Sequence, residues 1–348
     1  MQTRRAFIKT LLGFGALLLP WSVLPESWKA ASRNLLSAPP IKLSLPPEPE
    51  PEPEIGSGIP PEVLNRTALD DIAALSAPEM QGRKAGTLGE IVAADYLVAQ
   101  LEALGLEPGG DGGNSFKHVF TIPPVTEIIV NGRLTFKPGG INNLRIPGFN
   151  VLGVLEGKNP EEVILLSAHY DHLGIYQGRL YPGANDNASG VGCILSVLRR
   201  ILREGIAPER TVVLAFWSAE EMGLFGSQAF VASPTFPLSQ IRAVVNADTV
   251  GNGNTGDFIL WAGNENLAYS ALRAAASEVG ATATRAANAG HNSDSASFAN
   301  VGIPAVTILT RAWLERNHSP EDNIGLLKPE QLQLAEEIVY RTVQRLAF

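Results

Sequence analysis

Five side chains that could bind a metal ion follow apolar stretches of the sequence. They comprise two histidines and three carboxylates: His169, Asp186, Glu221, Asp248 and His318. A combination of imidazole and carboxylate ligands suits zinc better than calcium, which prefers oxygen ligands alone. Five ligands are too many for one tetrahedral zinc ion with an open position, but they suit two ions that share a bridging carboxylate. Any one of these acids could equally be a solvated loop residue or a helix cap, so the prediction depends on the whole set.

The elements expected to position these residues are buried strands that alternate with helices. Largely apolar runs at 163–166, 210–217 and 241–247 are typical of buried strands, and candidate ligands follow each of them. In open α/β sheets, ligand sites lie just beyond the carboxyl ends of such strands. The sequence therefore predicts a three-layer αβα fold, in which helices cover both faces of a central, mostly parallel mixed sheet.

Further elements are expected on either side of the candidate ligands. The apolar segment 150–155 is predicted to be a strand that pairs with the strand at 163–166. A buried helix is expected at 191–198, and a final helix from about 329 to 346.

The composition is that of a globular protein with a sizeable core. Of the 348 residues, 45% are hydrophobic and 18% are charged, and the net charge is −8. Lys and Arg form no run longer than two residues, as at Arg4-Arg5, which argues against a nucleic-acid partner. The single cysteine, Cys193, lies among apolar residues and is expected to be a small core side chain.

The first 32 residues resemble a twin-arginine export signal. The segment 3–9 reads TRRAFIK, and an apolar run follows at 10–24 that is interrupted by Pro20. This run is shorter than the roughly 20 residues that a membrane-spanning helix prefers. We therefore expect export to the periplasm or beyond the cell, with tethering to the membrane only if the signal segment stays uncleaved. An ordinary N-terminal anchor with two chance arginines is the alternative.

A spacer is expected between this segment and the folded domain. Residues 33–60 are rich in Pro and Glu, which alternate from Pro47 to Glu54. Proline fixes φ and removes hydrogen-bond donors, while like charges repel, so this linker should be extended. The remaining residues, 61–348, are expected to form the folded domain that carries the candidate ligands.

Five segments in this order closely resemble the di-zinc aminopeptidases of the aminopeptidase Y and bacterial leucyl aminopeptidase type. The segments are AHYDH at 168–172, GANDNASG at 183–190, SAEEMGLFGS at 218–227, NAD at 246–248 and HSPED at 318–322. The loops at 82–87 and 293–298 also look like features of this family. The resemblance covers the chain from about residue 60 onward, so it implies that 61–348 is a zinc peptidase catalytic domain with the zinc exopeptidase fold.

The resemblance implies a role for each candidate ligand. Asp186 would bridge two zinc ions per chain. His169 and Asp248 would complete one zinc site, and Glu221 and His318 would complete the other. Three carboxylates nearly offset two divalent cations, and the remaining positive charge favours a bridging hydroxide near neutral pH.

Two further acids are expected to take part in the reaction. Glu220 would act as the general base that takes a proton from the attacking water and passes it to the leaving amine. Asp171 is expected to accept the second ring N–H of His169 and so fix its tautomer. The resemblance also implies a cis peptide bond between Asp186 and Asn187.

The activity implied is hydrolysis of the N-terminal residue from peptides with a free N-terminus. A glutaminyl-cyclase-like transferase with a single zinc ion is an alternative on the same fold, and so is a carboxypeptidase or dipeptidase. A non-enzymatic receptor-like or zinc-buffering protein is a third class, but such proteins tend to lose a ligand or the base, and none is missing here. Side-chain preference and oligomeric state are not indicated by the sequence.

The remaining candidates are expected to be peripheral. His172 is interpreted as a loop residue or a residue behind the metal ligands, and His118 as an exposed strand residue. His291 is interpreted as a loop residue, with a role in the substrate pocket as the alternative. Asn317 could donate a hydrogen bond to the reacting carbonyl. Aromatic residues near the loops could line the substrate pocket or simply pack against one another: Tyr176, Phe225, Phe298 and Trp313.

Overall fold

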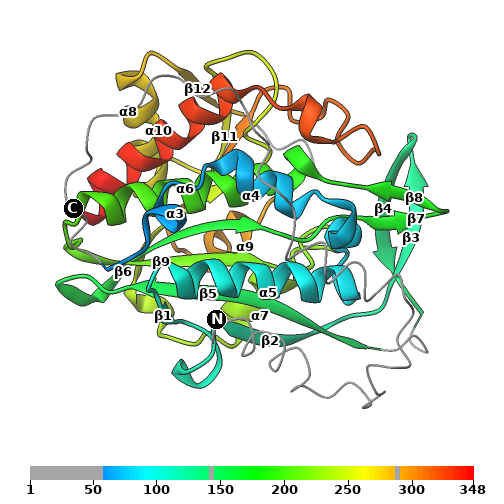
Figure 1. Cartoon of the computed structure of the whole chain (residues 1–348), viewed down its shortest axis with the longest axis horizontal. Coiled ribbons are helices and arrows are strands. Elements are labelled where there is room, and N and C mark those ends of the chain that lie inside the picture. The colour runs from blue at the N-terminus through cyan, green and yellow to red at the C-terminus, as the bar shows by residue number, and fades with distance from the viewer. Residues whose placement is uncertain (1–57, 141–144, 287–290) are drawn as a thin grey trace. The chain divides into compact units, whose positions relative to one another are not determined.

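A mixed sheet lies at the centre of the computed structural model, which describes residues 58–140, 145–286 and 291–348 (Figure 1). Within these residues the sheet has nine strands. They are β1 (Glu107–Pro108), β2 (Lys117–Ile122), β5 (Ile146–Leu155), β6 (Asn159–His169), β9 (Arg210–Trp217), β10 (Ile241–Ala247), β11 (Asp257–Trp261), β12 (Thr282–Arg285) and β13 (Ala305–Thr310). They pair in the order β1-β5-β9-β6-β10-β13-β11-β12, and β2 pairs with β5.

The middle of this sheet is parallel. Strands β9, β6, β10 and β13 run parallel to one another, while β5 and β11 pair antiparallel with β9 and β13. The predicted mixed sheet is therefore confirmed, with its parallel strands at the centre. The predicted pairing of 150–155 with 163–166 is wrong, because β9 lies between β5 and β6. Seven of the eight residues of β9 are buried, as expected for a strand with a neighbour on each side.

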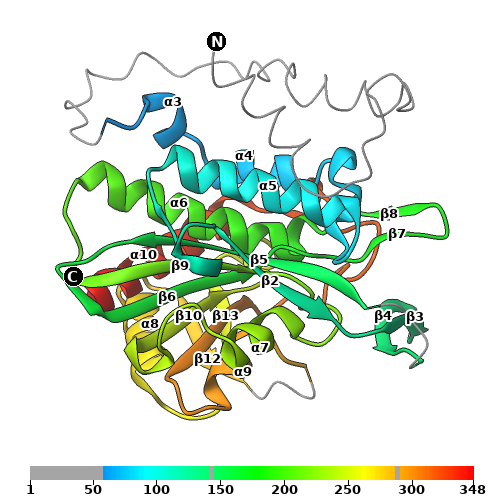
Figure 2. The same ribbon diagram turned by 90° about the horizontal axis from the view of Figure 1, so that it is seen from below.

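Helices cover both faces of the sheet, as expected for three layers. In Figure 2, α4 (Ala68–Leu75), α5 (Leu88–Ala103) and α6 (Ser189–Glu204) lie on one side, and α7 (Phe225–Ala232) and α9 (Ser295–Ala299) on the other. Helix α10 (Pro329–Ala347) packs against α6 and against α8 (Leu267–Glu278), and a short helix, α3 (Pro61–Leu64), precedes them. The αβα architecture predicted from the sequence is thus confirmed.

Alternate residues of the central strands enter two different cores. Ile164 and Leu166 of β6 pack with the helices on the α6 face, whereas Val163 and Leu165 pack with Phe230 on the α7 face. Successive side chains of a strand point to opposite faces, so a strand covered on both sides must be apolar at every position. This explains the continuous apolar runs and holds the carboxyl ends of the strands in fixed positions.

Two hairpins stand apart from the central sheet. They are formed by β3 (Val125–Val130) with β4 (Arg133–Pro138), and by β7 (Gly174–Tyr176) with β8 (Arg179–Tyr181). Leu134 of the first hairpin packs with Leu173, which precedes β7, and with Tyr181, the last residue of β8. Figure 1 shows the two hairpins side by side at one end of the sheet. Their position beside the loops that follow the strands brings them to the candidate site.

Most of the expected N-terminal organisation lies outside the described residues. The twin-arginine-type segment 1–32 falls there entirely, as does the linker 33–60 up to residue 57. Within the part of the chain that the structure describes, no helix combines the length and apolar character needed to cross a membrane.

Candidate metal centre

The five candidate ligands come together at one edge of the sheet. His169 is the last residue of β6, and Asp248 directly follows β10. Glu221 lies in the turn after β9, and His318 lies in the loop after β13. Asp186 is in the irregular segment that leads into α6. The parallel strands end at the same edge, so residues far apart in the sequence meet there.

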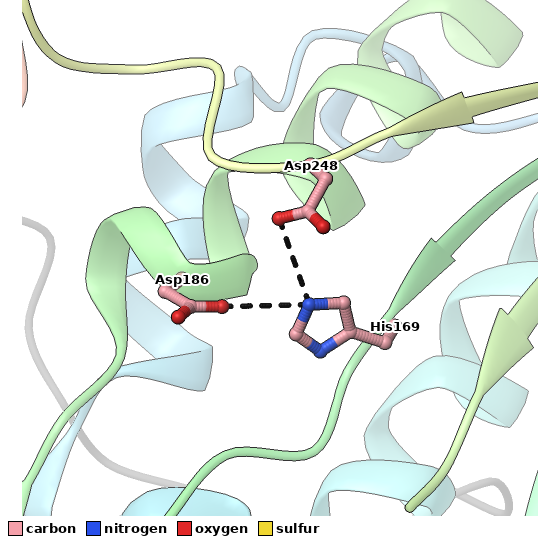
Figure 3. Close-up of side chains that lie close together, drawn as sticks. All are labelled: His169, Asp186 and Asp248. Atoms are coloured by element: carbon pink, nitrogen blue, oxygen red, sulfur yellow. Dashed lines mark ion pairs between the residues drawn. The ribbon is translucent and has the colours of Figure 1, made fainter. Parts of the chain in front are cut away.

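One half of the cluster is built around His169. Its Nε2 atom lies 3.4 Å from Oδ1 of Asp186 and 3.6 Å from Oδ1 of Asp248 (Figure 3). The His169 side chain is only 1% exposed. These three ligand atoms lie within 4.8 Å of one another, which is close enough for one metal ion to contact all of them.

The other half is built around His318. Its Nε2 atom lies 3.4 Å from Oδ2 of Asp186 and 2.9 Å from Oε2 of Glu221. The two carboxylate oxygens of Asp186 therefore face different halves of the cluster. A carboxylate in this position can bridge two cations.

His172 lies behind this second half. Its Nδ1 atom is 2.8 Å from Oε1 of Glu221, and its ring meets the His318 ring edge-on at 5.9 Å between centroids. Ligand atoms of His172, Asp186 and Glu221 also lie within 4.8 Å of one another. His318 is the better ligand candidate, because a single atom, Nε2, faces both Asp186 and Glu221. His172 then orients Glu221, in agreement with the position expected for it.

Backbone carbonyl groups orient both histidine ligands. Nδ1 of His169 lies 3.2 Å from the carbonyl oxygen of Asp171, and Nδ1 of His318 lies 2.7 Å from that of Leu134. When Nδ1–H donates to such an oxygen, Nε2 carries the free lone pair that a metal requires. The contact expected from the Asp171 side chain is thus made by its backbone, since Oδ1 is 3.8 Å from the ring nitrogen. That Oδ1 instead accepts the backbone N–H of Glu220 at 3.0 Å.

The adjacent acids Glu220 and Glu221 have opposite electrostatic environments. Burial raises the pKa of Glu220 well above its usual range, with the His169 imidazole opposing this effect. Burial also acts to raise the pKa of Glu221, but the His318 and His172 imidazoles together hold it well below its usual range. Oε2 of Glu220 lies 4.0 Å from Nε2 of His169, beside the cluster. Neighbouring carboxyls with separated pKa values are typical of a ligand and an acid–base group.

The donor set of the cluster fits zinc. It combines imidazole nitrogens with three buried carboxylates, and among the described residues these carboxylates form ion pairs with histidines only. Buried carboxylates without an Arg or Lys partner are costly unless cations compensate them. Nitrogen and oxygen ligands of these types suit zinc.

Residues 150–343 match the model of peptidase family M28. The chain belongs to this family. Aminopeptidase YwaD of Bacillus subtilis is 27% identical over 214 residues, which cover 56% of this chain and 44% of the relative. The leupeptin-inactivating enzyme 1 of Streptomyces exfoliatus is 28% identical over 158 residues, which cover 45% and 34%. The match thus spans less than half the length of these two relatives.

Solved structures show the same fold. BSAP, a zinc aminopeptidase from Bacillus subtilis, superposes with a TM-score of 0.63 at 20% identity, over 80% of this chain and 94% of that one. A glutaminyl cyclase of Porphyromonas gingivalis superposes with a TM-score of 0.59 at 19% identity, over 80% and 97%. A zinc aminopeptidase and a glutaminyl cyclase, the two kinds of enzyme considered from the sequence, therefore share the fold of this M28 chain.

A buried arginine supports the loops of the M28 centre. Arg83 is 0% exposed, and its guanidinium donates to four carbonyl oxygens, those of Leu75, Tyr170, Pro182 and Gly183. Burial lowers the pKa of Arg83 to about 10, while nearby acids oppose this shift. The sequence indicated that the loop 82–87 is a family feature. It did not predict that Arg83 in this loop joins the segments that carry His169 and Asp186.

The segment around Asp186 is held by several local devices. Asp322 accepts the backbone N–H groups of Asn185 at 2.8 Å and Asp186 at 2.9 Å, which joins the loop after β13 to this segment. Gly183 has φ +59°, and a Cβ atom there would lie 2.3 Å from the carbonyl oxygen of Asp186. Only glycine fits at that position. The expected cis peptide bond between Asp186 and Asn187 is confirmed.

A cavity of about 440 Å³ opens over the centre. Trp313 lines it, as expected, and packs edge-on against His291, whose alternative role in the pocket agrees with this position, and against Trp261, which the sequence did not assign to the pocket. The pocket role considered for Phe298 is wrong, because its side chain is fully buried in the core beside Trp217. Tyr176 and Phe225 pack in small clusters and do not line the cavity.

The prediction for His118 is also wrong. The residue is 4% exposed, its Nδ1 lies 3.0 Å from Nδ2 of Asn150, and its ring packs edge-on against Phe230. Strand β2 alternates, so His118 shares its inward face with Phe120 and Ile122. The alternation was visible in the sequence, but which face would be covered by α7 was not.

Proposed function

We propose that this chain is a zinc-dependent aminopeptidase that removes the N-terminal residue from peptides with a free N-terminus. We further propose that it holds two zinc ions. The observation that carries the proposal is the placement of Asp186, whose two oxygens face His169 on one side and His318 on the other. The same activity is supported by the membership of the chain in family M28. It is also supported by similar proteins such as aminopeptidase YwaD and BSAP, a zinc aminopeptidase.

The metal-binding residues follow from the two halves of the cluster. His169, Asp186 and Asp248 would hold one ion, and His318, Glu221 and the shared Asp186 would hold the other. Zinc bound there would supply Lewis acidity, which polarises the scissile carbonyl group and makes water easier to deprotonate. The contacts of Asp171 and Leu134 with the two rings would keep both Nε2 atoms directed at the metal positions.

Glu220 would transfer the proton. Its carboxylate takes a proton from the attacking water and then delivers it to the nitrogen of the leaving amine, as the C–N bond breaks. Burial raises its pKa, which makes the protonated form accessible for the second transfer. Asp171 accepts the backbone N–H of Glu220 and so fixes the turn that directs this carboxylate toward the cavity.

A glutaminyl-cyclase-like transferase with one zinc ion is the second candidate. The superposition on the Porphyromonas gingivalis glutaminyl cyclase favours it as far as the fold is concerned. The five converging ligands and the shared carboxylate favour the two-metal peptidase instead. A carboxypeptidase or dipeptidase of the same fold would differ in the end of the peptide that it recognises.

Metal analysis combined with a substrate panel tests the proposal. We expect two zinc ions per chain, loss of activity after chelation, and recovery on addition of zinc. Leucine p-nitroanilide and leucyl peptides should be hydrolysed, whereas their N-acetylated forms should not. One zinc ion with conversion of N-terminal glutamine to pyroglutamate would support the transferase, and equal cleavage of blocked and free substrates would contradict the aminopeptidase assignment.

We also propose that residues 1–32 direct export by the twin-arginine route and that 33–60 separate this segment from the catalytic domain, 61–348. The protein would then act in the periplasm or outside the cell. Replacing both Arg4 and Arg5 by Lys should leave the protein in the cytoplasmic fraction. Unchanged export of that variant would contradict the proposal.

A further inference from the structure

Arg133 is a cationic side chain at the edge of the candidate active site. Among the described residues that line the cavity, it is the only Lys or Arg; the other ionisable groups there are acids and imidazoles. Arg133 begins β4 and comes from the β3–β4 hairpin, which lies outside the 150–343 region that matches the family.

The guanidinium of Arg133 reaches the metal centre through one intervening side chain. Its Nη2 donates to Oδ1 of Asn317, and Nδ2 of Asn317 donates to Oδ2 of Asp186. Asn317 is 5% exposed, so this chain of contacts is shielded from water. A group that meets Arg133 in the cavity would consequently lie one amide group away from the carboxylate shared by both halves of the centre.

Arg133 has unused capacity for binding an anion. Among the described residues it forms no ion pair, and its Nε–H is buried with no hydrogen-bond partner. Guanidinium has five N–H donors arranged to meet a carboxylate through two parallel hydrogen bonds. Burial lowers the pKa of His291 in the same cavity, and the charge of Arg133 adds to this effect.

We propose that Arg133 binds a carboxylate of the substrate just beyond the scissile bond, an inference that rests on the aminopeptidase function proposed above. Two kinds of substrate carry such a group within a few covalent bonds of the reacting carbonyl. One is a dipeptide, through its C-terminal carboxylate, and the other is a peptide with an acidic second residue.

Matched pairs of substrates test this proposal and distinguish the two sources of the carboxylate. Leu-Gly is compared with Leu-Gly-amide, which lacks the terminal charge, and Leu-Asp-amide is compared with Leu-Asn-amide, which lacks the side-chain charge. Each pair is measured with the zinc-loaded parent protein and with Arg133→Met and Arg133→Lys. Lys137→Met serves as the control, because Lys137 is an exposed cation on the same strand that does not line the cavity.

In the parent protein, kcat/KM is expected to favour the charged member of at least one pair by about tenfold or more, which is typical of one charge-assisted hydrogen bond. Arg133→Met should reduce this ratio to near one, Arg133→Lys should keep part of it, and Lys137→Met should keep all of it. The pair that responds identifies the source of the carboxylate. An unchanged ratio in Arg133→Met, or an equal loss on both members of each pair, would overturn the proposal.

A binding measurement separates this inference from the proposed function. Zinc-loaded Glu220→Gln, alone and combined with Arg133→Met, is titrated with the same compounds in a calorimeter. A carboxylate preference in Kd that disappears with Arg133→Met supports the inference even if the parent protein hydrolyses none of the peptides. Equal Kd values for charged and neutral compounds in Glu220→Gln would contradict it, whatever the activity of the parent protein.

Discussion

The two halves of the candidate centre are built in different ways. His169 ends a central strand, is 1% exposed, and has its ring held by the carbonyl group of Asp171 two residues away. His318 lies in a loop with φ +57°, its side chain is 16% exposed, and its ring is held by Leu134, 184 residues away in the sequence. The first half depends on the sheet, whereas the second depends on the packing of a separate hairpin.

This difference indicates where the centre can be weakened without unfolding the protein. Strand β6 is buried on both faces, so its end moves little unless the core itself opens. The β3–β4 hairpin is anchored by a small cluster around Leu134, which can loosen locally. We therefore expect the His318 half to have the weaker metal affinity, and the following predictions test that comparison.

The largest effect is expected from Asp186→Ala, because this residue belongs to both halves. The variant should lose both zinc ions. Its activity should fall by more than about 100-fold, the upper end of the loss that is typical when a side chain that only orients a ligand is removed. Metal content and kcat/KM measure this. A variant that retains one tightly bound ion would show that Asp186 serves a single half.

Glu220→Gln should separate the chemistry from the metal binding of both halves. Loss of the proton-transfer group is expected to lower kcat by about 10²–10⁴-fold, while zinc content stays as in the parent protein. Steady-state kinetics and metal analysis provide the readout. Parental activity in this variant would remove Glu220 from the mechanism.

Leu134→Ala should weaken the His318 half selectively. Leu134 is fully buried, and its truncation leaves a cavity under the hairpin, so the carbonyl group that orients His318 becomes less well fixed. We expect the affinity for one zinc ion to fall about 10–100-fold, with the other unchanged.

A zinc titration with a competing chelator resolves the two affinities in this variant. Ile129→Ala is the control, since Ile129 is 50% exposed on the same hairpin. Equal weakening of both ions in Leu134→Ala would contradict the distinction between the halves.

The smallest effect is expected from Asp171→Asn. The backbone carbonyl group, not the side chain, contacts His169, and an Asn oxygen can still accept the Glu220 N–H. Zinc affinity should stay within a few-fold of the parent value, well below the about 10–100-fold cost of losing a group that orients a ligand. A large loss of zinc would show that the carboxylate itself fixes the His169 ring.

Local sequence features were sufficient to predict much of the fold and the ligand set. The apolar runs predicted the central strands because strands buried on both faces need apolar residues at every position. The ligands could be named because each lies in a short segment with a recognisable pattern. These predictions need no information about which distant segments meet.

Contacts between distant segments could not be predicted in this way. The pairing of β5 with β9, the Leu134–His318 contact and the burial of His118 under α7 all depend on the final packing. The Arg83 clamp has the same origin, since it collects carbonyl groups up to 100 residues away. No local period or motif encodes such partners.

The clamp formed by Arg83 has a further consequence for the acidic centre. The site needs rigid loops and also needs every one of its carboxylates available for cations. Arg83 joins its surrounding loops through main-chain carbonyl groups alone and forms no ion pair with an acid among the described residues. Rigidity is thus obtained without a direct ion pair to any metal ligand, so the carboxylate oxygens of the centre remain available to cations.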